Sequence, residues 1–65
     1  MITELKKERF FRGIKQVDLM KATGIYLMRL SMIENGHVTP RAEEKKKLAK
    51  ALGIPEKDLF PVKER

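Results

Sequence analysis

Few side chains in this 65-residue chain have the types and spacing that catalysis requires. The one histidine, His37, cannot activate a cysteine nucleophile, because the sequence contains no cysteine. Glu43 and Glu44 are adjacent, so on a helix their carboxylates point in different directions and cannot serve as an acid–base pair. Neither a glycine-rich phosphate loop nor a G-x-S-x-G motif is present. We therefore expect a protein that is not an enzyme and that binds no metal and no cofactor.

Basic side chains outnumber acidic ones. Lysine and arginine number 15 against 9 aspartates and glutamates, which gives a formal net charge of +6 and a pI near 9.9. In so short a chain this surplus favours a polyanionic partner, most simply nucleic acid. The alternative is a lysine-rich face that is only solvated, and the lysine run at 45–47 is more typical of such a face than of a binding site.

Glycine and proline divide the chain into short segments whose apolar residues recur at helical spacing, without the alternation typical of strands. Helices are expected over residues 3–12, 16–23, 27–35, 41–52 and 56–59. Thr3 is the expected N-cap of the first helix, and Gly24 allows a turn between the second and third because glycine tolerates a positive φ. The side chains expected inside are Leu5, Arg9, Phe10, Leu19, Met20, Thr23, Ile25, Leu30, Ile33, Ala42, Leu48, Ala49, Leu52 and Phe60.

The pattern predicts an all-α fold, a compact bundle of five short helices that forms a single domain over residues 1–65. The core is expected to span residues 3–60, followed by a short basic tail at 61–65. A core of this size provides roughly 3–5 kcal/mol of net stability, and helix packing or dimerisation must supply it because no disulfide can form. The amino terminus lacks an apolar signal region and no uncharged stretch approaches the roughly 18 residues of a membrane span, so we expect no membrane association and a cytoplasmic location.

Several short motifs follow one another in uninterrupted register. They are Gly13-Ile14-Lys15-Gln16, the turn Gly24-Ile25, Ile33-Glu34-Asn35-Gly36, Leu48-Ala49-Lys50-Ala51-Leu52-Gly53-Ile54 and Asp58-Leu59-Phe60. With these motifs the chain, from Leu5 to Phe60, resembles the lambda-repressor-like, Cro/C1-type (Xre family) helix-turn-helix domains. A bare helix-turn-helix pattern is a weak signal, but this combination is specific.

The resemblance implies that the second and third helices form a helix-turn-helix and that the third, over about residues 27–35, enters the major groove of double-stranded DNA. It implies sequence-specific binding by a transcriptional regulator of the repressor type, which binds pseudo-palindromic sites as a homodimer. The sequence does not indicate the dimer surface, although Phe60 and Val62, which follow Pro55, are candidates.

The resemblance also assigns contacts to the DNA backbone. Gln16 and Asn35 stand at matching positions, and Arg41 is close to a third. Lys15 departs from the family pattern, but its cation at the start of the second helix is well placed for phosphate. Gln16 and Asn35 are the only side-chain amides in the chain. The alternative is that Gln16 only fills the first turn of its helix and that Asn35 only caps the third. Arg9 and Glu34 match a family pair that forms a largely buried ion pair between the first and third helices.

The third helix departs from the family where base edges are read. The residues at these positions are Tyr26, Leu27, Met28, Arg29, Ser31 and Met32. Polar side chains match the donor and acceptor patterns of base pairs, whereas leucine and methionine can only contact thymine methyl groups or displace water. Three interpretations stay open. The first is a DNA reader whose polar contacts come from Arg29, Tyr26 and Ser31, while Leu27 and Met28 contact thymine methyl groups. The second is a docking face for a protein partner, as in an antitoxin or coactivator-like domain. The third is that the apolar residues are additional core residues or substitutions without functional meaning.

Three further departures concern local packing and capping. Met20 stands where the family has a small residue between the second and third helices, which predicts about 1–3 kcal/mol of strain or a wider angle. Lys15 and Tyr26 replace the serine or threonine caps of the second and third helices, so both helices are expected to lack a side-chain cap.

Overall fold

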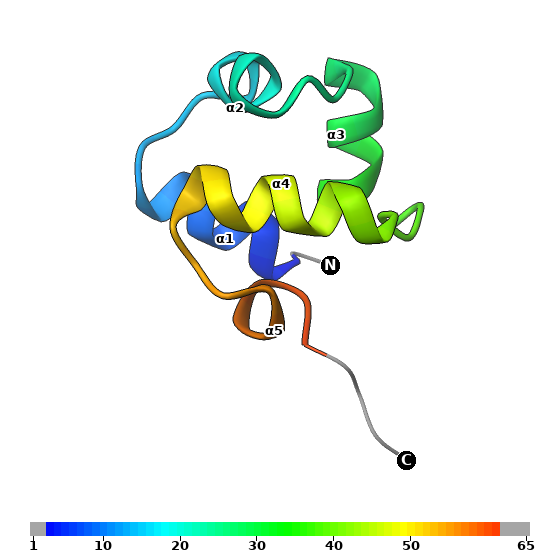
Figure 1. Ribbon diagram of the computed structural model, residues 1–65. Helices are drawn as coiled ribbons and strands as arrows, with labels where there is room; N and C mark the ends of the chain where they lie inside the picture. The colour runs from blue at the N-terminus through cyan, green and yellow to red at the C-terminus, as the bar shows by residue number, and fades with distance from the viewer. Residues whose placement is uncertain (1–2, 62–65) are drawn as a thin grey trace.

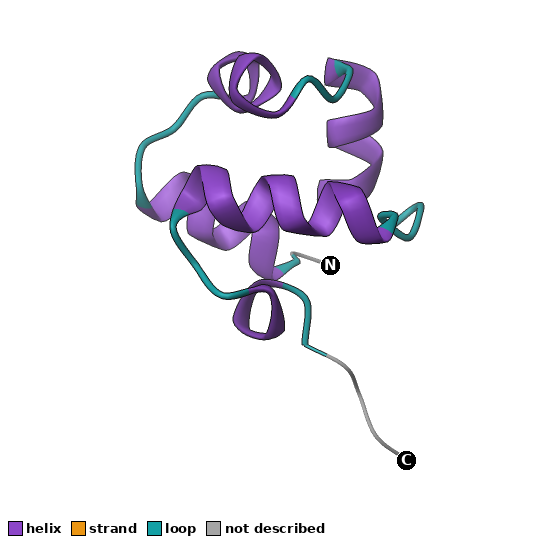
Figure 2. Ribbon diagram, in the orientation of Figure 1, coloured by secondary structure: helices purple, strands orange, loops and turns teal. Residues whose placement is uncertain are grey.

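The computed structural model describes residues 3–61, and every regular element within that range is a helix (Figure 2). The helices are α1 (Glu4–Phe11), α2 (Gln16–Thr23), α3 (Leu27–Glu34), α4 (Ala42–Leu52) and α5 (Glu56–Leu59). The predicted all-α, five-helix fold is confirmed, and each predicted boundary lies within one residue of the observed one. In Figure 1, α4 crosses the middle of the molecule, with α2 and α3 on one side of it and α5 on the other.

The beginning of α1 is capped by Thr3, as predicted. Its hydroxyl accepts a hydrogen bond of 3.2 Å from the backbone N–H of Lys6 and donates one of 2.7 Å to the backbone carbonyl of Glu34. The first bond satisfies an N–H group that has no partner within the helix. The second joins the start of α1 to the end of α3, so a local cap also fixes a contact between two helices.

The turn between α2 and α3 depends on Gly24 and Thr23. Gly24 adopts a φ of 77°, in the left-handed region, and its N–H donates to the carbonyl of Met20 at 2.7 Å. The buried Thr23 hydroxyl donates to the Leu19 carbonyl at 2.8 Å and accepts from the Ile25 N–H at 3.2 Å. The turn is therefore short and internally hydrogen-bonded, which holds α3 at a defined angle to α2.

The core consists of aliphatic side chains from all five helices and from the turn. Its buried members are Leu5, Leu19, Ile25, Leu30, Ile33, Leu48, Ala49, Leu52 and Leu59. Met20 is partly buried against this cluster. Each fully buried leucine contributes roughly 1.5–3 kcal/mol relative to an exposed one. This burial determines which side of α3 stays exposed, because Leu30 and Ile33 both face inward.

The prediction that Phe10 faces the interior is wrong. Leu5 and Arg9, four residues apart, occupy the inner stripe of α1 and are buried, whereas Phe10 is 62% exposed. Each residue turns an α-helix by about 100°, so the position after Arg9 leaves the stripe. With α1 only eight residues long, the inner stripe has room for two side chains.

Two more interior predictions need correction. Ala42 is exposed because it begins α4 at the end that lies beyond the core, and the buried part of α4 starts at Leu48. At the other end of the core Leu59 is fully buried, whereas Phe60 is only half-buried and packs against the cluster. The Phe60 ring lies 6.0 Å from the Lys45 ammonium. Val62 and most of the predicted tail lie outside the described residues.

None of the helices within residues 3–61 combines the length and the apolar character that crossing a membrane requires.

Candidate nucleic-acid interface

A buried ion pair between Arg9 and Glu34 connects α1 with α3. The Arg9 Nε lies 2.6 Å from Glu34 Oε2, and Nη2 donates to Oε1 at 3.0 Å. The third nitrogen, Nη1, donates to the carbonyl of Ile14 at 2.8 Å. Glu34 is fully buried, so its charge depends on this partner for compensation. The structure thus brings the two residues together, and the pair also holds the loop that leads into α2.

Gln16 joins this network from the first turn of α2. Its Nε2 donates to Glu34 Oε1 at 3.1 Å, and the side chain stays half-exposed. The next residue after Glu34 is Asn35, which is the exposed C-cap of α3. Glu34 therefore places the two side-chain amides of the chain at one site, where the start of α2 meets the end of α3. Both carry free donor capacity toward solvent, which is the requirement for a phosphate contact.

Lys6 belongs to the same site and was not selected from the sequence. Its ammonium donates to Asn35 Oδ1 at 3.1 Å, so a cation lies directly beside the amide. The Asn35 Nδ2 lies 3.5 Å from the Ser31 hydroxyl. The only sequence signal for Lys6 was its place next to buried Leu5 in a basic helix, and the partner 29 residues away could not be inferred from spacing.

Lys15 and Arg41 lie at the starts of α2 and α4, each in the N-cap position. Lys15 is the exposed N-cap of α2 and Arg41 that of α4, and neither side chain caps its helix. The first N–H groups of a helix carry a partial positive charge and bind anions, and a cation at the cap adds to that field. Lys15 directly precedes Gln16 in the chain. Arg41 lies at the start of α4, on the side of α3 that faces α4.

The outer face of α3 is apolar and exposed. Tyr26 is 83% exposed and Met28 77%, while Leu27 and Met32 are exposed to about half that extent, at 41% and 37%. These values exclude the interpretation that the four side chains are additional core residues. Tyr26 is the N-cap and makes no capping hydrogen bond, as expected. A helix with this face can fill a groove and contact methyl groups, but it offers few hydrogen bonds.

Arg29 does not join that exposed face. Its Nε lies 2.6 Å from Glu44 Oε2 and its Nη2 lies 2.9 Å from Glu44 Oε1, so α3 and α4 are joined by a two-bond ion pair. The hydrogen bond from Arg29 is the main cause that lowers the pKa of Glu44 to about 2, and the same bond raises the pKa of Arg29. The sequence did not predict this pair, because nothing in a spacing of 15 residues identifies Glu44 as the partner of Arg29.

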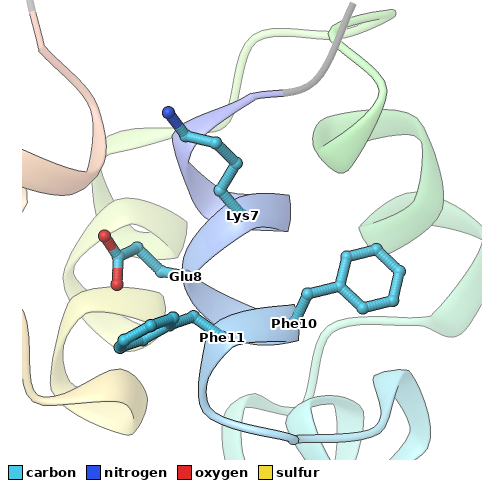
Figure 3. Close-up of a pocket in the computed structure, with 4 residues that line it drawn as sticks. All are labelled: Lys7, Glu8, Phe10 and Phe11. Atoms are coloured by element: carbon cyan, nitrogen blue, oxygen red, sulfur yellow. The ribbon is translucent and has the colours of Figure 1, made fainter.

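Phe10 and Phe11 form an exposed aromatic pair on α1, which Figure 3 shows with the two rings directed to different sides of the helix. Phe11 is 86% exposed, and both line a shallow surface depression together with Lys7 and Glu8. The Arg9 guanidinium lies 4.9 Å from the centre of the Phe10 ring. The sequence did not predict this pair, because helical spacing placed Phe10 with the core residues.

Metal-binding chemistry has no support between residues 3 and 61. That part of the chain contains no cluster of three or more histidine, cysteine, aspartate or glutamate side chains that could hold an ion. His37 lies exposed in the loop between α3 and α4.

A family model described as Helix-turn-helix matches residues 5–59, which is more than four fifths of the chain. The match begins at buried Leu5 and ends at buried Leu59, so it includes the core, the turn at Gly24 and the whole of α3. A search of curated proteins finds no match.

Proposed function

The chain belongs to the Cro/C1-type, lambda-repressor-like family of helix-turn-helix DNA-binding domains, and from this membership we propose that it is a cytoplasmic transcriptional regulator of the repressor type. In this proposal residues 1–65 act as one domain without catalytic activity. The domain binds specific sequences in double-stranded DNA by placing α3 in the major groove.

The position of the two amides beside the exposed face of α3 is the observation that carries this proposal. Phosphate contacts orient a helix in the groove, and base contacts then select the sequence. Gln16 donates to the Glu34 carboxylate, Asn35 follows Glu34 in the chain, and the Lys6 ammonium is bonded to Asn35. We assign contacts with the DNA backbone to Gln16, Asn35, Lys15 and Arg41.

Base recognition in this proposal relies on shape and methyl groups more than on hydrogen bonds. The contacting side chains are Tyr26, Leu27, Met28, Ser31 and Met32. Met28 and Met32 are four residues apart on one exposed face, so both can reach the floor of the groove. Because only thymine presents a methyl group there, we expect a preference for A·T pairs opposite these side chains.

We propose further that two copies bind one pseudo-palindromic site. Half-sites on the same face of the duplex are one helical turn apart, about 34–36 Å. The two protomers would therefore place their α3 helices in two successive major grooves. Phe60, half-buried at the end of α5, is a candidate for the contact between the copies.

Selection of bound duplexes from a random pool at physiological salt tests the function. The expected motif is two-fold symmetric and rich in thymine at the positions opposite Met28 and Met32. Gln16→Ala should weaken binding to all duplexes alike, since it removes a phosphate contact, and should leave the dependence of affinity on salt unchanged, because the amide carries no charge. Lys46→Ala on the exposed face of α4 is the control, with folding of each variant checked by circular dichroism. Failure of the wild-type chain to enrich any sequence would contradict sequence-specific binding.

A second candidate, a protein-binding module on the same fold, is favoured by the exposed apolar side chains of α3. Surfaces rich in methionine adapt to protein partners, and exposed apolar patches mark such contacts. The same selection separates the two functions. A chain that binds no duplex at low salt, yet is well folded, would support the protein-binding module.

A further inference from the structure

The carboxylate of Glu44 is held by three donors at the beginning of α4. Two are the Nε and Nη2 groups of Arg29, and the third is the backbone N–H of Arg41, which donates to Oε1 at 2.7 Å. The Glu44 side chain is 14% exposed and that of Arg29 30%. Two parallel N–H···O bonds between a guanidinium and a carboxylate fix both the position and the plane of the guanidinium. Arg29 is thus held by a group that is itself fixed to the backbone.

This pairing changes what α3 presents to a groove. Arg29 is the only basic residue of α3. It follows Met28 by one position, so its side chain leaves the helix about 100° away from that of Met28. It therefore lies on the flank that faces α4, and the outward face retains Met28 and Met32.

Arginine is the most frequent reader of guanine, which it contacts through two N–H groups at once. To make that contact, Arg29 would have to give up its two hydrogen bonds to the Glu44 carboxylate for two hydrogen bonds to a guanine. The charged carboxylate is a stronger acceptor than the neutral base. The choice between thymine and guanine beside α3 therefore depends on whether Glu44 keeps Arg29.

We propose that Glu44 is a specificity-determining positioning residue, which holds Arg29 against α4 so that the recognition helix selects thymine-rich sites and does not read guanine. The inference rests on the proposed DNA-binding function. It assigns the base preference to an acidic residue on α4, outside the helix-turn-helix.

The test compares motifs selected from random duplexes by the wild-type chain, Glu44→Gln, Glu43→Gln and Arg29→Gln. Glu44→Gln keeps an acceptor for the Arg41 N–H but removes the charge that holds Arg29. We expect it to gain guanine at one position in each half-site and to bind a duplex with that guanine about tenfold more tightly than the wild-type chain does. Arg29→Gln should leave the wild-type motif unchanged. A variant that combines Arg29→Gln with Glu44→Gln should lose the guanine gained by Glu44→Gln alone.

Glu43→Gln is the matched control, because Glu43 loses the same charge in the same helical turn but is exposed and has no hydrogen bond or ion pair among residues 3–61. It should raise affinity for all duplexes equally, without a new base in the motif. An identical gain of guanine in Glu43→Gln would assign the effect to net charge and overturn the inference.

Arg29→Gln also keeps the inference testable if Glu44→Gln folds poorly. Loss of a guanine from the motif in Arg29→Gln would show that Arg29 reads the base with Glu44 in place, which overturns the inference while leaving DNA binding intact. A wild-type chain that selects no motif overturns the proposed function and this inference together. In the wild-type complex, the NMR signal of the Arg29 Nε–H should keep the chemical shift that it has in the free chain.

Discussion

The hydroxyl of Thr3 caps α1 and at the same time donates a 2.7 Å hydrogen bond to the backbone carbonyl of Glu34. Glu34 is the last residue of α3, so one hydroxyl serves the first turn of one helix and the last turn of another. The Glu34 side chain also accepts hydrogen bonds from Arg9 and Gln16. The end of α3 is therefore fixed from three directions.

Replacing Thr3 by alanine should lower the free energy of unfolding by about 1–2 kcal/mol. The variant loses the cap on the Lys6 N–H and the hydrogen bond to the Glu34 carbonyl. Thr3→Ser keeps the hydroxyl and should cost less than half as much. Thr39→Ala in the exposed loop is the control and should stay within about 0.5 kcal/mol of the wild-type chain. Urea unfolding measures all three, and equal values for Thr3→Ala and Thr39→Ala would show that the cap contributes nothing.

Removing one partner of the Arg9–Glu34 pair should cost about 3–5 kcal/mol, because the other charge stays buried without compensation. Arg9→Met is the suitable variant, since it keeps an aliphatic stem in the core. The exposed pair of Arg12 and Glu8 provides the comparison, and Arg12→Met should cost about 1 kcal/mol or less. Thermal unfolding of the two variants would contradict the assignment if their midpoints fell by the same amount.

Gly24→Ala should destabilise the protein by about 1–2 kcal/mol through the backbone alone. The φ of 77° is unfavourable for any residue with a Cβ, whereas that Cβ would meet no described atom within 4 Å. Gly24→Asn should cost less, since asparagine tolerates the left-handed conformation better. Chemical denaturation of both variants measures the difference, and a larger loss for asparagine would indicate a steric cause.

Acid should weaken the contact between α3 and α4 in a defined range. The pKa of Glu44 is lowered to about 2 from an ordinary value of 4.5, so the folded state favours the ionised form. Its contribution to stability is complete above the ordinary pKa and is lost as the pH falls from about 4.5 to about 2. Stability measured across that range should fall less steeply in Glu44→Gln than in the wild-type chain. Glu43→Gln should keep the wild-type slope, and parallel slopes for all three proteins would contradict the pairing.

The aromatic pair on α1 should be replaceable without loss of stability. Phe11→Lys is expected to change the free energy of unfolding by less than about 0.5 kcal/mol, because the ring is 86% exposed. Leu5→Ala on the opposite side of α1 should cost about 2–5 kcal/mol. A loss in Phe11→Lys comparable to that in Leu5→Ala would mean that the ring is buried in solution, for instance between two copies.

Local features of the sequence were sufficient to place the helices. The bounds of α2 and α5 were predicted without error, because Gly24 and Pro55 act on the backbone next to them and need no partner. Helical spacing likewise assigned Leu30 and Ile33 to the interior, which left the apolar residues of α3 on the outside. The predicted meeting of Arg9 with Glu34 came from the family resemblance, not from spacing.

Tertiary structure alone decided which charged side chains form ion pairs and which stay available for a partner. Arg29 appeared available for base contacts from its place on α3, and only the crossing of α3 and α4 brings it to Glu44. In the same way, the packing of α1 on its neighbours leaves room for Leu5 and Arg9 and turns Phe10 outward. Periodicity reports the direction of a side chain relative to its own helix axis, whereas pairing and exposure depend on the distance and angle between axes.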